Sequence, residues 1–265
     1  MVEPTVQELF DLSGRTALVT GGTGHLGSAL SRALAEAGAS VVISSRDQER
    51  GAAAAAQLPV VGDARHLAVQ LDHMDPDSLA RGFDAALEAT DGRIDVLVNN
   101  GHEALANDWK SVTFEQFQRH LGNAAGYFEL ARRTRNAAVE RASSASIILL
   151  GSMYGQVASY ADAYEGVCQA SPVAYHALKG GIIHLTRHLA AYWAPDSVRV
   201  NCLSPGPFPS EKAPAAMVER LKTKLPMKRM GRAHELKGAI VFLASDASSF
   251  MTGQNLTIDG GWTAW

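Results

Sequence analysis

The chain has 265 residues, of which 46% are hydrophobic and 19% charged, and its formal net charge at pH 7 is −3. This composition is typical of a compact α/β protein with a large core, and chains of this length often form one domain. Because the chain has no overall basic charge, nucleic acid is not expected as a partner.

The first residues predict a cytoplasmic protein. Residues 1–13 lack the charged and then apolar pattern of a secretory signal, and no apolar run is long enough to span a bilayer. The two cysteines, Cys168 and Cys202, indicate neither a disulfide framework nor a metal cage. We therefore expect a reducing compartment and no membrane partner.

A strand, a glycine-rich turn and a helix open the chain. Residues 15–20 are β-prone, residues 21–27 read Gly-Gly-Thr-Gly-His-Leu-Gly, and a helical pattern continues to residue 38. Gly22, Gly24 and Gly27 fit G-x-G-x-x-G, in which small residues let the backbone approach a pyrophosphate at a helix N-terminus. An ordinary glycine turn is the alternative, but the flanking strand and helix favour dinucleotide binding.

The second predicted strand, residues 39–44, ends in Ser44-Ser45-Arg46. An acidic residue at this position would hydrogen-bond the 2′-hydroxyl of the adenosine ribose, whereas Arg suits a 2′-phosphate. NADP(H) is therefore favoured over NAD(H). Asp47 follows directly and weakens the preference, and a solvated loop Arg is the alternative interpretation.

Strand and helix patterns alternate along the rest of the chain. Helices are expected at 50–57, 76–90, 114–138, 175–193, 211–224 and 235–245, and strands at 67–71, 94–98, 147–150, 199–203 and 255–258. The alternation predicts a Rossmann-type, doubly wound parallel sheet of about seven strands flanked by helices. We expect one dinucleotide-binding catalytic domain over residues 1–265.

Polar residues follow several of these strands. Asp72, Asn99-Asn100-Gly101 and Gly151-Ser152 each stand where a strand ends, and open α/β sheets bind ligands at that edge. Asn-Asn-Gly also forms turns, which is compatible with a role in binding.

Two segments are expected to shape a substrate pocket. Residues 153–174 read as a long irregular excursion, and such loops are often functional, although a surface excursion or subunit contact is the alternative. Residues 207–230, after a proline-rich break, are expected to form a mobile helical lid.

Tyr175 and Lys179 stand four positions apart in a helical run and so share a helix face. A Lys ammonium near a Tyr hydroxyl favours the phenolate and lowers the phenol pKa from about 10, which makes it a usable acid or base. Such a pair often occurs by chance, so its meaning depends on the other residues.

Taken in order, the motifs closely resemble the short-chain dehydrogenase/reductase family over nearly the whole chain. They are Thr20-Gly21 to Gly27, Asn99-Asn100, Asn123, Ser152, Tyr175 with Lys179, and Pro205-Gly206. The resemblance implies that Tyr175 is the general acid/base and that Lys179 lowers its pKa and holds the nicotinamide ribose. It also implies that Ser152 orients the substrate oxygen and that Asn123 anchors a water in a proton relay through Lys179.

The resemblance further implies a cofactor site, carbonyl reduction or alcohol oxidation, and a homo-oligomer, a dimer or a tetramer. Asp72 looks like the adenine contact, and Ser210 stands where the family often has a Thr at the carboxamide. The expected cofactor-binding residues are Gly21, Thr23, His25, Leu26, Ser45, Arg46, Asp72, Asn99, Gly101, Tyr175, Lys179, Pro205, Gly206 and Ser210.

The chain departs from the family pattern at several places. His25 replaces a usual Gly, so the turn fits the T-G-x-x-G-x-x-G spacing of the longer nucleotide-sugar-modifying branch, for whose added domain this chain is too short. Gly101-His102 replaces Ala-Gly, which puts His102 near the substrate. The interval from Ser152 to Tyr175, 175 − 152 = 23 positions, is longer than usual.

The long interval with Tyr164-Glu165-Gly166, and the ending at 259–265, resemble members linked to surface-polysaccharide and flagellin-glycan sugars. This likeness indicates a polyhydroxylated substrate. The candidate substrate contacts are His102, Tyr154, Tyr164 and Phe208.

The leading hypothesis is an NADP(H)-dependent oxidoreductase that acts on a secondary alcohol or ketone, with a sugar or cyclic polyol as the expected substrate. One alternative is a sugar-modifying dehydratase or epimerase that uses the cofactor transiently, and another is a non-catalytic cofactor-binding protein. His184 and His188 share a helix face, but no third ligand accompanies them, so no metal is expected.

Overall fold

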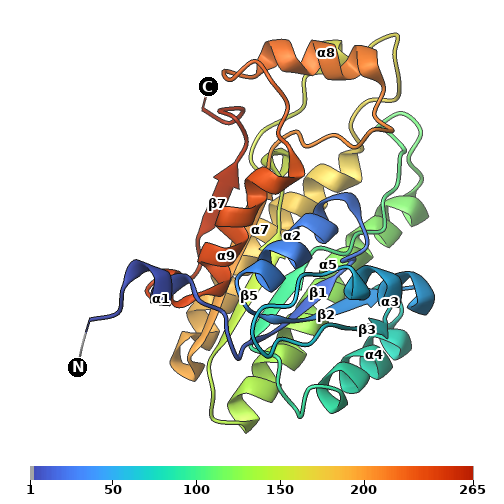
Figure 1. Cartoon of the computed structure of the whole chain (residues 1–265). Helices are drawn as coiled ribbons and strands as arrows, with labels where there is room; N and C mark the ends of the chain where they lie inside the picture. Colours follow the sequence, from blue (N-terminus) through green and yellow to red (C-terminus); the bar gives the residue numbers. More distant parts are fainter. Residues whose placement is uncertain (1–2, 265) are drawn as a thin grey trace.

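The computed structural model describes residues 3–264, so Met1, Val2 and Trp265, the ends of the predicted domain, lie outside the described residues. Seven parallel strands form one sheet in the order β3-β2-β1-β4-β5-β6-β7 (Figure 1). They are β1 (Thr16–Thr20), β2 (Ser40–Ser45), β3 (Leu67–Gln70), β4 (Val96–Asn99), β5 (Ala145–Leu150), β6 (Val198–Pro205) and β7 (Asn255–Ile258). The predicted Rossmann-type fold class is confirmed.

Helices cover both faces of this sheet. They are α1 (Val6–Phe10), α2 (His25–Glu36), α3 (Gln48–Ala56), α4 (Pro76–Glu88), α5 (Phe114–Glu140), α6 (Ala161–Tyr164), α7 (Val173–Trp193), α8 (Ala215–Lys224) and α9 (Lys237–Ala244). Side chains alternate along each strand, so Leu18 of β1 joins one core with α4, α5 and α7, while Ala17 and Val19 join the core with α2 and α9. Two apolar layers therefore hold the sheet between them.

No helix among residues 3–264 is both long enough and apolar enough to cross a membrane. The long α5 helix, which carries Asn123, begins with a capping box in which Thr113 and Gln116 satisfy each other's backbone N–H groups. Its start is thereby fixed relative to the loop that follows β4.

The predicted boundaries need several corrections. The helix expected from residue 211 begins at Ala215, directly after Pro214, and the helix expected from residue 235 is preceded by a 3₁₀ turn over Ala233–Leu236. The helix expected from Tyr175 begins at Val173. The short α1 helix, which Thr5 and Glu8 cap, was not predicted.

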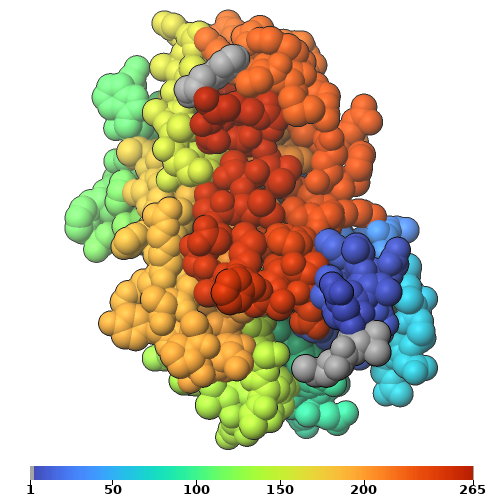
Figure 2. Space-filling view, turned by 90° about the vertical axis from the view of Figure 1, so that its left-hand side faces the viewer, coloured from blue at the N-terminus to red at the C-terminus, as the bar shows by residue number. Residues whose placement is uncertain are grey.

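The excursion over residues 153–172 is more ordered than the sequence indicated. It contains a 3₁₀ turn at Met153–Gly155 and the α6 helix, and its aromatic side chains share an apolar cluster with Leu221 of α8 and Trp262 near the C-terminus. Lys224 of α8 forms an ion pair of 2.5 Å with Asp162. In Figure 2 the red C-terminal segment borders the yellow-green excursion and the orange segment that includes α8. The segment predicted as a lid therefore contacts the excursion through this ion pair and the shared apolar cluster.

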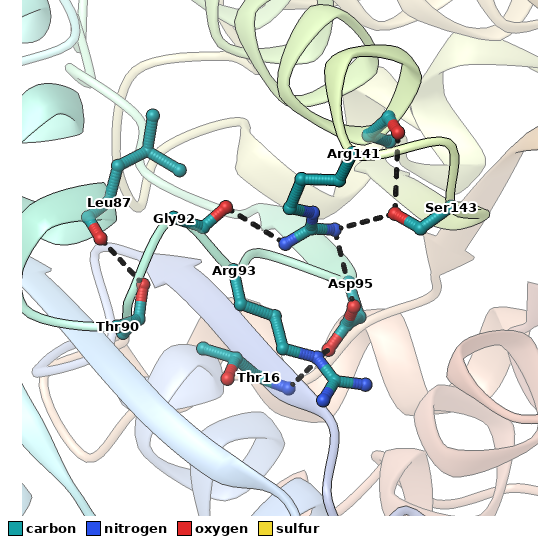
Figure 3. A network of polar contacts seen from close by, with 9 residues as sticks. Thr16, Leu87, Thr90, Gly92, Arg93, Asp95, Arg141 and Ser143 are labelled. Carbon is teal, nitrogen blue, oxygen red and sulfur yellow. Dashed lines mark hydrogen bonds and ion pairs between the residues drawn. The ribbon is translucent and has the colours of Figure 1, made fainter.

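At the opposite end of the sheet, one buried carboxylate joins three segments of the chain. Asp95 accepts the backbone N–H of Thr16 at 2.8 Å and Nε of Arg93 at 2.7 Å, and Arg141 after α5 lies 3.4 Å away (Figure 3). Arg141 also donates to the carbonyl of Gly92 at 2.9 Å. This network ties the starts of β1 and β4 to the end of α5.

Asp95→Ala tests the network. The substitution leaves the buried N–H of Thr16 without its acceptor, so we expect the free energy of unfolding to fall by about 2 kcal/mol in urea denaturation. Asp84→Ala is the matched control, because that exposed carboxylate lies 3.4 Å from Arg133, and we expect a change within about 0.5 kcal/mol. Equal effects of the two substitutions would contradict a structural role for Asp95.

Candidate active site

A cavity of about 540 Å³ lies at the carboxyl ends of β1, β2, β3 and β4. These strands end side by side, so the turns that follow them converge on one place. The cavity brings together eight of the predicted cofactor residues. They are Gly21, Thr23, His25, Leu26, Ser45, Arg46, Asp72 and Gly101.

The glycine-rich turn approaches the strand edge too closely for larger side chains. A Cβ on Gly27 would lie 2.2 Å from the carbonyl oxygen of Gly21 and 2.7 Å from Nδ2 of Asn100. Asn100 donates to the carbonyls of Thr20 and Gly21 at 2.9 and 3.2 Å, which locks the turn after β4 to the turn after β1. The backbone is therefore held in place at the floor of the cavity.

Asn99, predicted as a cofactor contact, lies elsewhere. Its side chain is buried and donates to the carbonyl of Tyr127 at 2.9 Å, whereas the side chain of the neighbouring Asn100 lines the cavity. Successive side chains of a strand point to opposite faces, so only one of the two asparagines faces the cavity.

Two arginines line the cavity where β2 ends. Arg46 was predicted there, and Arg50 of α3 also lines the cavity and donates to the carbonyl of Thr23 at 3.2 Å. Asp47, between them, accepts the backbone N–H of Arg50 at 3.0 Å and so caps α3. Sequence analysis did not single out Arg50, although a second cation one helical turn after Arg46 was a readable signal.

Tyr175 and Lys179 lie on one face of α7, as the spacing predicted, but their electrostatics differ from expectation. Nζ of the buried Lys179 donates to the carbonyl of Leu150 at 2.6 Å and lies 5.6 Å from the ring centres of Tyr127 and Tyr175. Burial lowers the pKa of Lys179 to about 8. Burial raises the pKa of Tyr175, and a hydrogen bond with the Ser152 hydroxyl opposes this rise. Burial of the phenol therefore dominates the Tyr175 pKa, and the role predicted for Lys179 stays a prediction.

The Asn123 side chain holds the turn after β4 against α5. Its Oδ1 accepts the N–H of Glu103 and Nε2 of His73, both at 2.8 Å, and its Nδ2 donates to the carbonyls of Glu103 and His120. Both ends of the amide are therefore engaged in positioning the chain, while the relay predicted for Asn123 stays a prediction.

His102, predicted to lie near the substrate, lines the cavity and meets Tyr175 edge-on, with ring centres 5.4 Å apart. His120 of α5 packs against both rings. His73 and His120 were missed, because isolated histidines in a strand end and a helix carry no distinctive spacing.

Other predicted residues lie away from this cavity. The hydroxyls of Tyr154 and Tyr164 bond to each other at 2.8 Å within the excursion, and Phe208 lines a separate cavity of about 210 Å³. Pro205, Gly206 and Ser210 do not line the main cavity either. Among residues 3–264, no group of three or more His, Cys, Asp or Glu side chains is arranged to hold a metal ion.

A family model described as "Enoyl-(Acyl carrier protein) reductase" matches residues 23–263. The chain is 33% identical to D-arabinitol 2-dehydrogenase [ribulose-forming] of Scheffersomyces stipitis, with 97% of this chain and 96% of that protein covered. It is 34% identical to galactitol 2-dehydrogenase (L-tagatose-forming) of Cereibacter sphaeroides, with 97% and 98% covered.

Two solved structures are similar to this chain over nearly its whole length. A short-chain type dehydrogenase/reductase from Mycobacterium marinum has a TM-score of 0.89 and 34% identity, with 98% of this chain and 100% of that chain covered. A gluconate 5-dehydrogenase from Burkholderia cenocepacia, in complex with NADP and tartrate, has a TM-score of 0.85 and 30% identity, with 98% and 100% covered.

Gly27→Ala tests the close approach at the floor of the cavity. The new Cβ would meet the Gly21 carbonyl, so we expect a loss of stability on the order of 1–3 kcal/mol together with weaker NADPH binding in fluorescence titrations. Gly238→Ala in α9, where a Cβ meets nothing within 4 Å, should leave NADPH binding unchanged and should not lower stability. Undiminished NADPH affinity in Gly27→Ala would argue against a cofactor at this turn.

Proposed function

This chain belongs to the short-chain dehydrogenase/reductase family, and we propose that it interconverts a polyhydroxylated secondary alcohol and its ketone with NADP(H), using Tyr175 as general acid/base. The relatives that it matches include dehydrogenases of D-arabinitol, gluconate and galactitol, and the similar gluconate 5-dehydrogenase structure contains NADP. The chain is accordingly an NAD(P)-dependent dehydrogenase/reductase of secondary alcohols and ketones. The choice of NADP(H), the substrate class and the residue roles are the proposal.

The residues at the sheet edge suit a dinucleotide. A Cβ on Gly27 would lie 2.2 Å from the Gly21 carbonyl oxygen, so glycine lets the turn pack closely against the start of α2, where backbone N–H groups would bind a pyrophosphate. Asp72 would contact the adenine, and Arg46 with Arg50 would hold a 2′-phosphate. When bound, the nicotinamide supplies or accepts a hydride.

Tyr175, Ser152 and Lys179 would manage the proton. The observation that carries this assignment is that Tyr175 and Lys179 share one face of α7, with Nζ of Lys179 5.6 Å from the centre of the Tyr175 ring and bound to the carbonyl of Leu150 at the end of β5. Ser152 follows β5 at the same edge of the sheet, and its hydroxyl lowers the Tyr175 pKa. Tyr175 would donate its proton to the forming alkoxide in reduction, and Ser152 would orient the substrate oxygen. Lys179 would supply positive charge beside the phenol.

The cofactor choice follows from charge. Arg46 and Arg50 are both exposed at the cavity rim, and Asp47 is engaged in capping α3. A 2′-phosphate would therefore lie near the guanidinium groups of Arg46 and Arg50, while the carboxylate of Asp47 accepts a backbone N–H.

Assembly and location complete the proposal. Leu121 and Phe128 on α5 and Tyr192 on α7 are large and exposed, which supports a homo-oligomer, a dimer or a tetramer, formed through these two helices. We place the enzyme in the cytoplasm on the sequence arguments above.

A redox reaction is favoured over a dehydratase or epimerase. The relatives and structures reported above are named dehydrogenases or reductases, which supports a net redox reaction. The residues that the reaction needs also argue against a non-catalytic binding protein.

Tyr175→Phe should remove the proton donor and leave the cofactor site intact. We expect kcat for ketose reduction to fall on the order of 10²-fold or more, with the NADPH dissociation constant unchanged. Tyr192→Phe removes an exposed hydroxyl and is the control. Turnover that survives in Tyr175→Phe would overturn the assignment of Tyr175.

Arg46→Ala and Arg50→Ala test the cofactor preference. Each removes a charged donor, so the KM for NADPH should rise on the order of tenfold while the KM for NADH stays nearly constant. Arg81→Ala, on the exposed face of α4, is the control. A wild-type enzyme that strongly prefers NADH would contradict the proposed role of these arginines.

A further inference from the structure

Three histidines surround the phenol and the lysine of the proposed catalytic set. His73 follows β3, His102 follows β4 and His120 belongs to α5, so three separate elements bring imidazoles to one place. Nε2 of His73 is hydrogen-bonded to Oδ1 of Asn123, as described above. His102 and His120 form a pair that the proposed mechanism does not use.

The pair is in direct contact with Tyr175. The rings of His102 and His120 meet edge-on with centres 5.0 Å apart, and their Nε2 atoms are 3.4 Å apart, at the long end of the hydrogen-bonding range. Both rings also stand edge-on to Tyr175, at 5.4 and 6.2 Å between centres. His102 alone of the pair both lines the cavity assigned to the cofactor and contacts Tyr175, so it is the member that would lie beside a substrate held between them.

Both imidazoles are neutral at physiological pH. Burial, followed by the positive charge of Lys179, lowers the pKa of His102 to about 3. Burial and Lys179 also lower the pKa of His120. The pair is therefore a source of hydrogen bonds and not of charge.

The contact between the rings defines which nitrogen is free. Nδ1 of His120 is buried and has no hydrogen-bond partner within the described residues 3–264. A buried lone pair costs less than a buried unpaired N–H, which favours His120 donating from Nε2 and keeping Nδ1 unprotonated. His102 then accepts at Nε2 and carries its proton on Nδ1, which leaves an N–H donor for a substrate oxygen.

The surroundings favour a hydroxyl as the partner of this donor. The carboxylate of the adjacent Glu103 is held by Arg119 through two bonds, at 2.5 and 2.9 Å. That arginine is therefore engaged and offers no free cation to attract a substrate carboxylate to His102. A neutral donor beside Tyr175 suits an uncharged oxygen next to the reacting carbon.

We propose that His102 binds the hydroxyl on the carbon next to the reacting carbon, so that the enzyme prefers vicinal diols and α-hydroxy ketones, and that His120 positions His102. This inference rests on the proposed function, since Tyr175 must hold the reacting oxygen. His102 is then a substrate-contacting residue, and His120 acts through it.

A matched pair of alcohols tests the inference. Vicinal cyclohexanediol and cyclohexanol share a ring and differ by one hydroxyl, and each is oxidised with NADP⁺ by the wild-type chain and by His102→Ala. The wild type should prefer the diol, and His102→Ala should lower the ratio of kcat/KM for the diol to that for cyclohexanol on the order of tenfold. The dissociation constant for NADPH and the melting temperature report whether each variant remains folded.

Further variants separate contact from position. His102→Gln keeps a donor and should retain part of the preference. His120→Leu should raise the KM for the diol with little change in kcat, and His120→Gln should restore part of the loss. His234→Ala, on the exposed 3₁₀ turn before α9, should leave the ratio of the two alcohols unchanged.

Two results would overturn the inference: a wild-type enzyme that treats both alcohols alike, or a His102→Ala variant that loses both activities equally. A wild-type enzyme that oxidises neither alcohol counts against the proposed function. In that case calorimetric binding of the diol to the enzyme with NADP⁺ decides the inference, because weakening in His102→Ala supports it and unchanged affinity contradicts it.

Discussion

The Asn123 amide is the interaction on which the arrangement of this site depends. Its two ends hold His73 after β3, the backbone of Glu103 after β4 and the carbonyl of His120 within α5. These bonds hold the turn that carries His102 against α5, which packs beside α7. One buried side chain thus aligns the cofactor edge of the sheet with the helix that presents Tyr175.

Burial then determines the chemistry of the groups so aligned. It keeps the pKa of Tyr175 above and that of Lys179 below the ordinary values, and it keeps His102 neutral. The Ser152 hydroxyl is the group that favours the phenolate. The phenol of Tyr175 therefore has three kinds of neighbour: charged Lys179, neutral His102 and the hydroxyl of Ser152. This environment suits the transfer of a proton to a polyol oxygen.

Much of the fold was readable from the sequence. Strand and helix periods, the glycine turn and the i,i+4 spacing of Tyr175 and Lys179 are local signals, and the seven-stranded sheet confirms the predicted class. Contacts between distant segments could not be predicted from the sequence. The hydroxyls of Tyr154 and Tyr164 bond to each other in the cluster that joins the excursion, α8 and Trp262, a contact that the sequence did not indicate. Their predicted contacts with the substrate stay a prediction. Which asparagine lines the cavity, Asn99 or Asn100, depends on the orientation of the strand, which the sequence does not show. His120 reaches the site only through side-chain packing between distant segments.

The central claim is a net redox reaction on a polyhydroxylated substrate, and stoichiometry tests it most directly. Nicotinamide absorbance is followed while a ketose and its polyol are quantified in the same reaction with the wild-type enzyme and NADPH. The account predicts one NADPH oxidised for each polyol formed. Conversion of the sugar with no net change in absorbance would contradict it and would indicate a dehydratase or epimerase that uses the cofactor transiently.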